Sequence, residues 1–251
     1  YQTYTFDLAA SAVTVSSQNS GGPSDAPLRP DTYEYWQPTE LPAIWLLDLG
    51  VSRDVDYVGV VGNLGSAGAA IKIETWPGSG SPDSDYDLFA AEVLPADDSP
   101  IMFLDDSRVT RYVRITLTGG AVMPKIAVVY VGEVLAMPRS IYGGHVPIPL
   151  SRDTVLKQQL SRGGHFLGQG FRRHGFKSQA SFRFLTAAWY RASFDPFVQA
   201  ARKYPYFFGW RPETFPTEVG YCWTSEDIAG SNMGQKDYMQ VAWSMRGYGG
   251  E

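Results

Sequence analysis

The stretch WLLDLGVSRDVDYVGVVG, residues 45–62, decides the fold of the first half of this chain. Apolar residues dominate both of its ends, and Gly50 separates them. Short runs rich in Val, Trp and Tyr are typical of β-strands, so we expect one strand over 43–50 and another over 56–63. Similar runs recur between turns rich in Gly and Pro, at 12–17, 69–76, 110–119 and 125–135. No helix of useful length competes with them, so this half is predicted to form an antiparallel β-sandwich.

The composition supports a mainly β protein. The chain has 251 residues, enough for one large domain or two ordinary ones, and 14% of them are aromatic. Cys222 is the only cysteine, which excludes a disulfide framework and a multi-cysteine metal site and favours a reducing compartment. No apolar run approaches the roughly 18 residues of a membrane span, and no signal peptide is apparent, so we expect no membrane insertion.

The two halves differ in charge. Residues 1–133 hold 7 Lys and Arg against 18 Asp and Glu, a net charge of −11, whereas residues 134–251 hold 14 against 8, a net charge of +6. This asymmetry has two interpretations. The halves are either two solvated surfaces of different composition, or two domains of which the basic one faces an acidic neighbour or copy in an assembly.

Three pieces of the first half, WLLDLGVSRDVDYVGVVG, RYVRITL and KIAVVYVGEV, follow one another along the chain. In these pieces the region of roughly residues 30–135 resembles the discoidin family of galactose-binding-like jelly-rolls. In that family a Trp-led strand ending in Asp-Leu-Gly precedes a hydrophobic strand, and a late Arg-Tyr-Val-Arg-Ile strand precedes the final one. The resemblance implies a jelly-roll domain over residues 1–136. Because the family binds ligands through variable loops, no carbohydrate-binding residue carries over to this chain.

An acidic stretch resembles the start of a calcium-binding loop. Asp83, Asp85 and Asp87 stand at alternate positions, as the first ligands of such a loop do. The sixth position is Leu88 instead of Gly, however, and the twelfth is Leu94 instead of Glu. We therefore expect a solvated acidic loop and no metal site.

Aromatic residues cluster just before the first long strand. Tyr33, Tyr35 and Trp36, together with Trp45, are candidates for a glycan platform, because exposed rings stack on the apolar faces of sugars. The alternative is that Trp45 belongs to the core and that residues 33–36 form a lid or an interface. Under the first interpretation a host-surface glycan is a partner.

The second half begins with a Pro- and Gly-rich segment, 137–151, which we expect to be a linker into a domain over 152–251. A strand up to Leu160, a long glycine-rich loop over 161–176 and a strand from Phe176 are predicted next. In that strand the side chains Phe176, Ser178, Ala180, Phe182 and Phe184 share one face. Asp195 and Pro196 predict a helix start, and three strands are predicted to follow, within 204–212, 218–226 and 237–248.

The stretch GQGFRRHGFKS, residues 168–178, comes within one residue of a phosphate-binding P-loop. A P-loop must leave a strand and enter a helix, so that the helix N-terminus faces the phosphate. Here a strand follows the glycines, and Phe176 separates Gly175 from Lys177. The nucleotide interpretation is therefore rejected.

The predicted order of elements in residues 150–250 resembles the phage tail-tube fold. A small sheet with a long exposed loop between two early strands, one helix and closing strands is typical of tail-tube, tail-terminator and distal tail proteins. A jelly-roll beside such a module resembles a siphophage distal tail or baseplate protein. The resemblance implies a ring of copies on the virion, assembled in the host cytoplasm, with the tail tube protein, baseplate hub and tail fibres as partners. The loop residues expected at the contact between subunits are Arg162, His165, Phe166, Arg172, Arg173 and Lys177.

No enzyme signature stands out. His145, His165 and His174 form no zinc motif, and Cys222 lies in an alternating strand, where a packed residue is more common than a nucleophile. We therefore expect no catalysis, no cofactor, no metal and no specific nucleic acid. Two functions stay open, a structural ring subunit of a phage tail tip and a carbohydrate-binding module that mediates adhesion.

Overall fold

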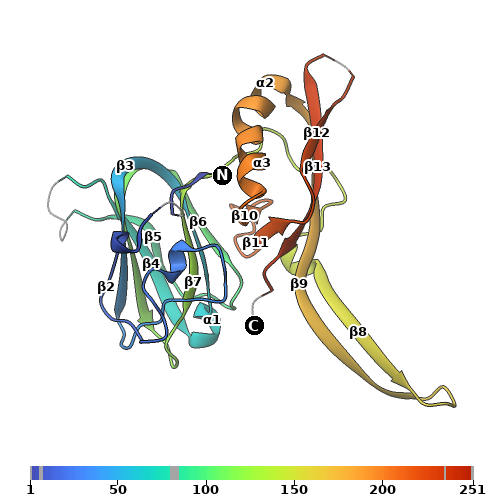
Figure 1. The fold of residues 1–251 in the computed structure, drawn as a ribbon, viewed down its shortest axis with the longest axis horizontal. Helices are drawn as coiled ribbons and strands as arrows, with labels where there is room; N and C mark the ends of the chain where they lie inside the picture. The colour runs from blue at the N-terminus through green and yellow to red at the C-terminus, as the bar shows by residue number, and fades with distance from the viewer. Residues whose placement is uncertain (1, 6–7, 80–84, 235, 250–251) are drawn as a thin grey trace. The chain divides into compact units, whose positions relative to one another are not determined.

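The computed structural model describes residues 2–5, 8–79, 85–234 and 236–249, without the side chains of Gln2, Thr3, Arg173 and His174. The chain divides into two compact units, Tyr1–Ala136 with Glu251, and Met137–Gly250. Each unit is built around an antiparallel sheet, which confirms the predicted mainly β fold (Figure 1). No helix in the described residues is long and apolar enough to cross a membrane.

The first unit contains seven strands in the order β1-β7-β3-β6-β4-β5, with β2 paired to β3. Short helical turns, η1 (Ala10–Ala12), η2 (Ala26–Leu28) and α1 (Leu64–Ala67), connect them. The strands are β1 (Gln2–Thr3), β2 (Val13–Val15), β3 (Ala43–Gly62), β4 (Ala69–Trp76), β5 (Asp87–Val93), β6 (Ile101–Gly119) and β7 (Ile126–Glu133).

The two strands expected over 43–50 and 56–63 are the halves of one bent strand, β3. Gly50 has a φ of +77°, and the register against β6 shifts between Asp48 and Arg53. Both halves stay paired to β6, which bends with its partner. Bulges of this kind increase the local twist of a strand without ending it.

The core of the first unit is a continuous cluster of aliphatic side chains and two tryptophans. Alternate residues of β3, β4 and β6 point into it, because successive side chains of a strand lie on opposite faces. Fully buried members include Trp45, Leu47, Ile71, Ile73, Ile115, Leu117 and Ile126. Trp45 is therefore a core residue, as one of the two interpretations expected.

Ion pairs lie on the other face of this sheet, one between β4 and β6 and one within β4. Arg114 Nε lies 2.9 Å from Glu74 Oε2, and Lys72 Nζ lies 3.1 Å from Glu74 Oε1. Burial acts to raise the pKa of Glu74, but the hydrogen bonds from Arg114 and Lys72 outweigh it and leave that pKa lowered. Hydrogen bonds from Arg111 likewise lower the pKa of Asp48.

The second unit has strands in the order β10-β11-β13-β9-β8, with β12 paired to β13. One helical segment crosses one face of this sheet (Figure 1). The strands are β8 (Arg152–Leu160), β9 (Phe166–Thr186), β10 (Tyr206–Gly209), β11 (Val219–Thr224), β12 (Ala229–Asn232) and β13 (Tyr238–Gly247).

The helix predicted from Asp195 is present and continues a helical segment that begins at Ala187. The segment consists of α2 (Ala187–Trp189), a π turn η4 (Tyr190–Phe194) and α3 (Asp195–Ala201). Thr186 caps it, since its hydroxyl accepts a hydrogen bond from the Trp189 N–H at 3.3 Å. Asp195 has helical dihedral angles, so its predicted role as the N-cap is wrong.

Aromatic side chains fill the space between the helix and the sheet. Phe194 and Phe197 of the helix contact Trp243 of β13, with ring centroids 5.7 and 6.4 Å apart. Trp243 also stacks on Phe182 and donates a hydrogen bond from Nε1 to the Tyr206 hydroxyl at 3.0 Å. The buried indole N–H is thereby satisfied.

The predicted inward face of β9 is correct up to Phe182 and fails at Phe184. A bulge between Met239 and Val241 of β13 places two β9 residues opposite one partner residue. Phe184 has a φ of +58°, and its side chain is exposed. Because a bulge moves the following residues by one position, Leu185 takes the buried site instead.

The segment expected to be a linker packs against the second sheet. The Tyr142 N–H bonds to the Ser181 carbonyl at 2.7 Å, and the Ser178 hydroxyl bonds to the Val146 carbonyl at 2.6 Å. The turn η3 (Ile148–Leu150) buries Ile148 above Gly220.

We predict that Glu74→Gln destabilises the first unit at neutral pH. The pKa of Glu74 is lowered on folding. The stabilisation that the Glu74 carboxylate gives to the folded state is therefore complete at pH values above its unfolded-state pKa of about 4.3, and it is lost as the pH falls through its folded-state pKa. We expect a loss of about 1 kcal/mol at pH 7 and less at pH 3, measured by urea unfolding of the full chain. Exposed Glu40→Gln is the matched control, and equal losses for Glu74→Gln at both pH values would contradict the assignment.

Candidate functional site

The region expected to be a long loop, 161–176, is mostly strand. Strand β9 already begins at Phe166, and only the turn between Leu160 and Phe166 connects it to β8. The turn closes through a hydrogen bond from the Ser161 N–H to the His165 carbonyl, at 2.8 Å. The prediction of a loop is wrong because three of its glycines, Gly168, Gly170 and Gly175, lie in strand β9, and only Gly163 and Gly164 lie in the turn.

Half of β9 extends beyond the rest of its sheet. Strand β13 pairs with it from Phe176 to Thr186, whereas β8 pairs with it from Phe166 to Phe176. Residues 152–175 therefore form a two-stranded projection, which we call the ribbon (Figure 1). Only its own two strands pair within it among the described residues.

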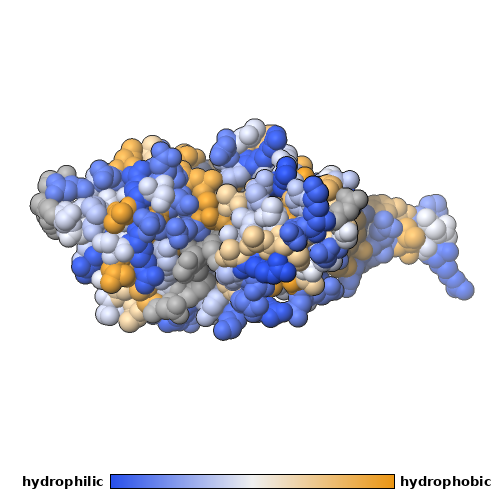
Figure 2. Space-filling model, turned by 90° about the horizontal axis from the view of Figure 1, so that it is seen from above, coloured by the Kyte–Doolittle hydropathy of each residue, from blue (hydrophilic) through white to orange (hydrophobic). Residues whose placement is uncertain are grey.

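One face of the ribbon is apolar and exposed. Leu156 and Phe171 lie opposite each other in the register, with 56% and 77% of their surface exposed. Leu160 and Phe166 form a second exposed apolar pair at the turn end, and the polar pair of Gln158 and Gln169 lies between the two. Figure 2 shows apolar and charged groups close together on this projection.

The opposite face is basic and flat. Alternation along the strands places Lys157 and Arg172 on this face, together with Gly168 and Gly170. Neither glycine has a positive φ, and a Cβ built on either of them meets no atom within 4 Å. The fold of this chain therefore does not itself require glycine at these two positions.

The structure brings together most of the residues expected at a subunit contact. Arg162, His165, Phe166 and Arg172 lie on the ribbon with exposed side chains. Arg173 lies on β9 opposite Thr154, but its side chain is outside the described part of the chain. Lys177 lies apart from them, opposite Arg246 in the main sheet, and is exposed.

The apolar strand residues of the ribbon were missed as site residues in the sequence. Leu156 and Leu160 lie on one face of the strand that was predicted up to Leu160, and Val155 lies on the other face, opposite Arg172. The signal that could have identified them is the presence of two glycines, Gly168 and Gly170, in the strand that pairs with β8. Those glycines are compatible with an exposed ribbon and unusual in a packed strand.

The proposed glycan platform on the first unit is only partly present. Tyr33 is 90% exposed, and Tyr35 lies beside Lys125, whose Nζ is 4.3 Å from the ring centroid. Trp36 is fully buried and pairs with Ile126, so its predicted role in the platform is wrong. Adjacent side chains on extended backbone alternate in direction, which separates Tyr35 from Trp36.

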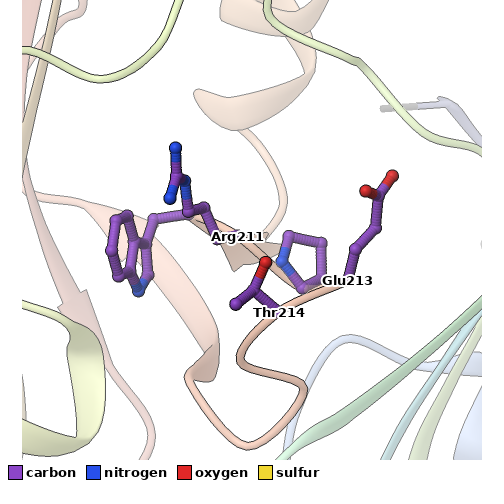
Figure 3. A pocket seen from close by; sticks show the side chains of 5 residues that line it. Arg211, Glu213 and Thr214 are labelled. Carbon is purple, nitrogen blue, oxygen red and sulfur yellow. The ribbon is translucent and has the colours of Figure 1, made fainter.

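A shallow hollow on the second unit is lined by a single loop. It has a volume of about 430 Å³, and its lining consists of Trp210, Arg211, Pro212, Glu213 and Thr214 (Figure 3). The Trp210 indole donates a hydrogen bond to Glu218 and stacks on Phe215 at 5.3 Å. The side chains of Arg211 and Glu213 lie apart from each other, so the hollow gathers no pair of groups for acid–base chemistry.

Cys222 and His145 are packed within the second unit. Cys222 is fully buried, and burial raises the pKa of its thiol, as expected for a packed residue and not for a nucleophile. His145 lies against the rings of Phe208 and Trp210, and its Nδ1 is 2.8 Å from the Gln179 carbonyl oxygen. No three His, Cys, Asp or Glu side chains among the described residues are grouped as metal ligands.

No protein-family model matches this chain, and no curated protein matches it in sequence. Among solved structures, a chitosan-binding module of a chitosanase/glucanase from Paenibacillus sp. IK-5 is 17% identical, with a TM-score of 0.46 over 53% of this chain and 100% of that one.

Two further similar structures are modules of the same general kind. The family 32 carbohydrate-binding module of NanJ from C. perfringens, in complex with galactose, is 18% identical, with a TM-score of 0.41 over 49% of this chain and 94% of that one. The family 32 module of AlyQ, in complex with 4,5-unsaturated mannuronic acid, is 17% identical, with a TM-score of 0.44 over 53% and 100%. At these identities the similarity concerns the fold alone, over about half of the chain.

We predict that Gly170→Thr leaves the fold intact. Since the site has free space and an ordinary φ, we expect the free energy of unfolding to stay unchanged or to rise by up to about 1 kcal/mol, because threonine suits a strand better than glycine does. Gly175→Ala is the contrasting control. Its φ is +101°, and the new Cβ would lie 2.4 Å from the Gly247 carbonyl oxygen.

Thermal unfolding of both variants distinguishes the two positions. We expect a lowered Tm for Gly175→Ala alone. A comparable loss for Gly170→Thr would show that glycine is required there by the fold itself.

Proposed function

We propose that this chain is a structural subunit of a bacteriophage tail tip, in which copies close into a ring that joins the tail tube to the tip or its fibres. The observation that carries the proposal is the apolar face of the ribbon. Large exposed apolar groups that lie together on a folded protein mark interaction surfaces. Burying each such side chain stabilises a contact by about 1.5–3 kcal/mol.

The shape of the ribbon also supports assembly. A two-stranded hairpin without a second layer is marginally stable on its own, so contact with a neighbouring copy would order it. A projection that docks elsewhere on the next copy makes a head-to-tail contact, and such contacts generate rings when the rotation closes. The first unit, a jelly-roll, would then be displayed as a docking surface for fibres.

The order of elements in the second unit is compatible with this assignment. Two early strands that extend into a projection, one helical segment and closing strands follow one another, which is the order that resembles the tail-tube fold. The proposal places the protein on the virion after assembly in the host cytoplasm, with the tail tube protein, baseplate hub and fibres as partners. It assigns the chain no catalytic role.

We predict that the double variant Leu156→Ser and Phe171→Ser dissociates the assembly without unfolding the protein. Both side chains are mostly exposed, so neither contributes to the core of its own chain. The expected result is an oligomer for the unaltered chain and a monomer for the variant, measured by light scattering coupled to size-exclusion chromatography. Negative-stain images should show closed rings for the unaltered chain.

The matched control replaces two exposed valines of the first unit, Val109→Ser and Val122→Ser, which should leave the mass of the oligomer unchanged. A monomeric unaltered chain at micromolar concentration, with a normal thermal transition, would refute self-assembly as its function.

A second function, recognition of a cell-surface glycan, is favoured by one residue of the first unit. The side chain of Tyr33 is almost fully exposed. The Arg29 guanidinium bonds to Glu34 and, at 2.9 Å, to Asp25, which places polar groups in the same loop. An exposed ring beside polar groups is compatible with sugar stacking.

We predict that Tyr33→Ala abolishes glycan binding if the first unit has this function. The measurement is a glycan array with the full chain, followed by titration calorimetry with the strongest ligand. Tyr142→Ala, which removes an exposed tyrosine from the second unit, is the control and should bind normally. Equal binding by both variants would remove Tyr33 from the site.

A further inference from the structure

We infer that the basic side chains of the ribbon dock against an acidic strip on the first unit of a second copy of this chain. The inference rests on the proposed self-assembly and specifies the surface that receives the ribbon. Its starting point is the set of cations on the ribbon, Arg152, Lys157, Arg162 and Arg172. All four side chains are exposed.

These cations have no acidic partner in the described part of the chain. Among the described residues, no ion pair joins any of the four to an Asp or Glu, and the second unit contains one ion pair, Arg202 with Asp227. Asp153 is the only acidic residue in the ribbon. The ribbon is therefore a positively charged projection that attracts an acidic surface.

The first unit has the opposite imbalance. Each of its seven Lys and Arg residues is engaged within the unit, five in ion pairs and two, Arg53 and Lys125, over tyrosine rings. Its 18 Asp and Glu residues thus leave an acidic excess that the unit does not neutralise. The two surfaces are complementary in charge.

One place on the first unit combines acidic groups with exposed apolar ones. Strand β5 ends the strand order of its sheet, and Asp87 and Glu92 lie on it with exposed side chains. Leu88, Val93 and Leu94 are exposed beside them. This acidic strip, residues 87–94, offers the negative charge that the basic face of the ribbon lacks, and exposed apolar groups lie beside that charge.

Other surfaces of a second copy fit less well. A second ribbon carries the same cations, and like charges in contact are destabilising. The exposed face of the second sheet presents Lys177, Arg183 and Arg246, which are also cations. The flat face at Gly168 and Gly170 lets the partner approach the backbone between Lys157 and Arg172.

The test is a reciprocal charge reversal in the full chain. One variant carries Lys157→Glu and Arg172→Glu, and the other carries Asp87→Lys and Glu92→Lys. Each alone places like charges across the contact, so we expect at least a tenfold weaker self-association, measured by sedimentation velocity. An equimolar mixture restores opposite charges in both contacts and should recover the mass of the unaltered assembly.

Arg139→Glu with Lys203→Glu is the matched control, because it makes the same change of net charge at exposed positions outside the ribbon. Circular dichroism and thermal unfolding establish that every variant is folded. The control should assemble like the unaltered chain.

Three outcomes overturn the inference. If single variants keep the unaltered mass, or if their mixture stays dissociated while the unaltered chain assembles, the acidic strip is not the receiving surface and only this inference fails. If the unaltered chain is monomeric, the proposed self-assembly fails as well. Binding of that monomer to phosphatidylglycerol vesicles, lost on reversal of Lys157 and Arg172, would assign the ribbon to a lipid surface instead.

Discussion

The exposed ribbon of the second unit exists because strand β9 is longer than its neighbour β13. Strand β9 continues from Thr186 back to Phe166, but β13 covers it only as far as Phe176. Beyond that point β8 is the only strand that pairs with β9 among the described residues. The apolar pair Leu156 and Phe171 is therefore exposed by the construction of the sheet, and only contact with another molecule can bury it.

The charges of the first unit and of the ribbon are opposite in sign. The first unit satisfies its cations internally and keeps an acidic excess, whereas no ion pair among the described residues engages Arg152, Lys157, Arg162 or Arg172 of the ribbon. The same projection carries two glycines, Gly168 and Gly170, that the fold of the chain does not itself require. Both features acquire a physical reason once the ribbon lies against another chain.

Much of the fold was predictable from the sequence, because the alternation of apolar and polar residues along a strand indicates which of its side chains are buried. Most strands of the first half and the inward face from Phe176 to Phe182 follow from this alternation, but β5 and residues 101–109 of β6 were not predicted, and β5 lies where an acidic loop was expected. The failures have local causes that such patterns do not reveal. A bulge moved Phe184 to the surface, Thr186 instead of Asp195 began the helix, and the glycines of 168–175 were interpreted as a loop although they lie in a paired strand.

The candidate contact residues were predicted on a loop, whereas most of them lie on a two-stranded ribbon. The most direct test of the proposed assembly is hydrogen exchange of residues 152–175. The amides of the ribbon should exchange more slowly at concentrations where the chain is assembled than at concentrations where it is monomeric, with the core of both units unchanged. Exchange that is equally fast in the ribbon while the particle mass rises would show that the assembly forms elsewhere, and would contradict the account.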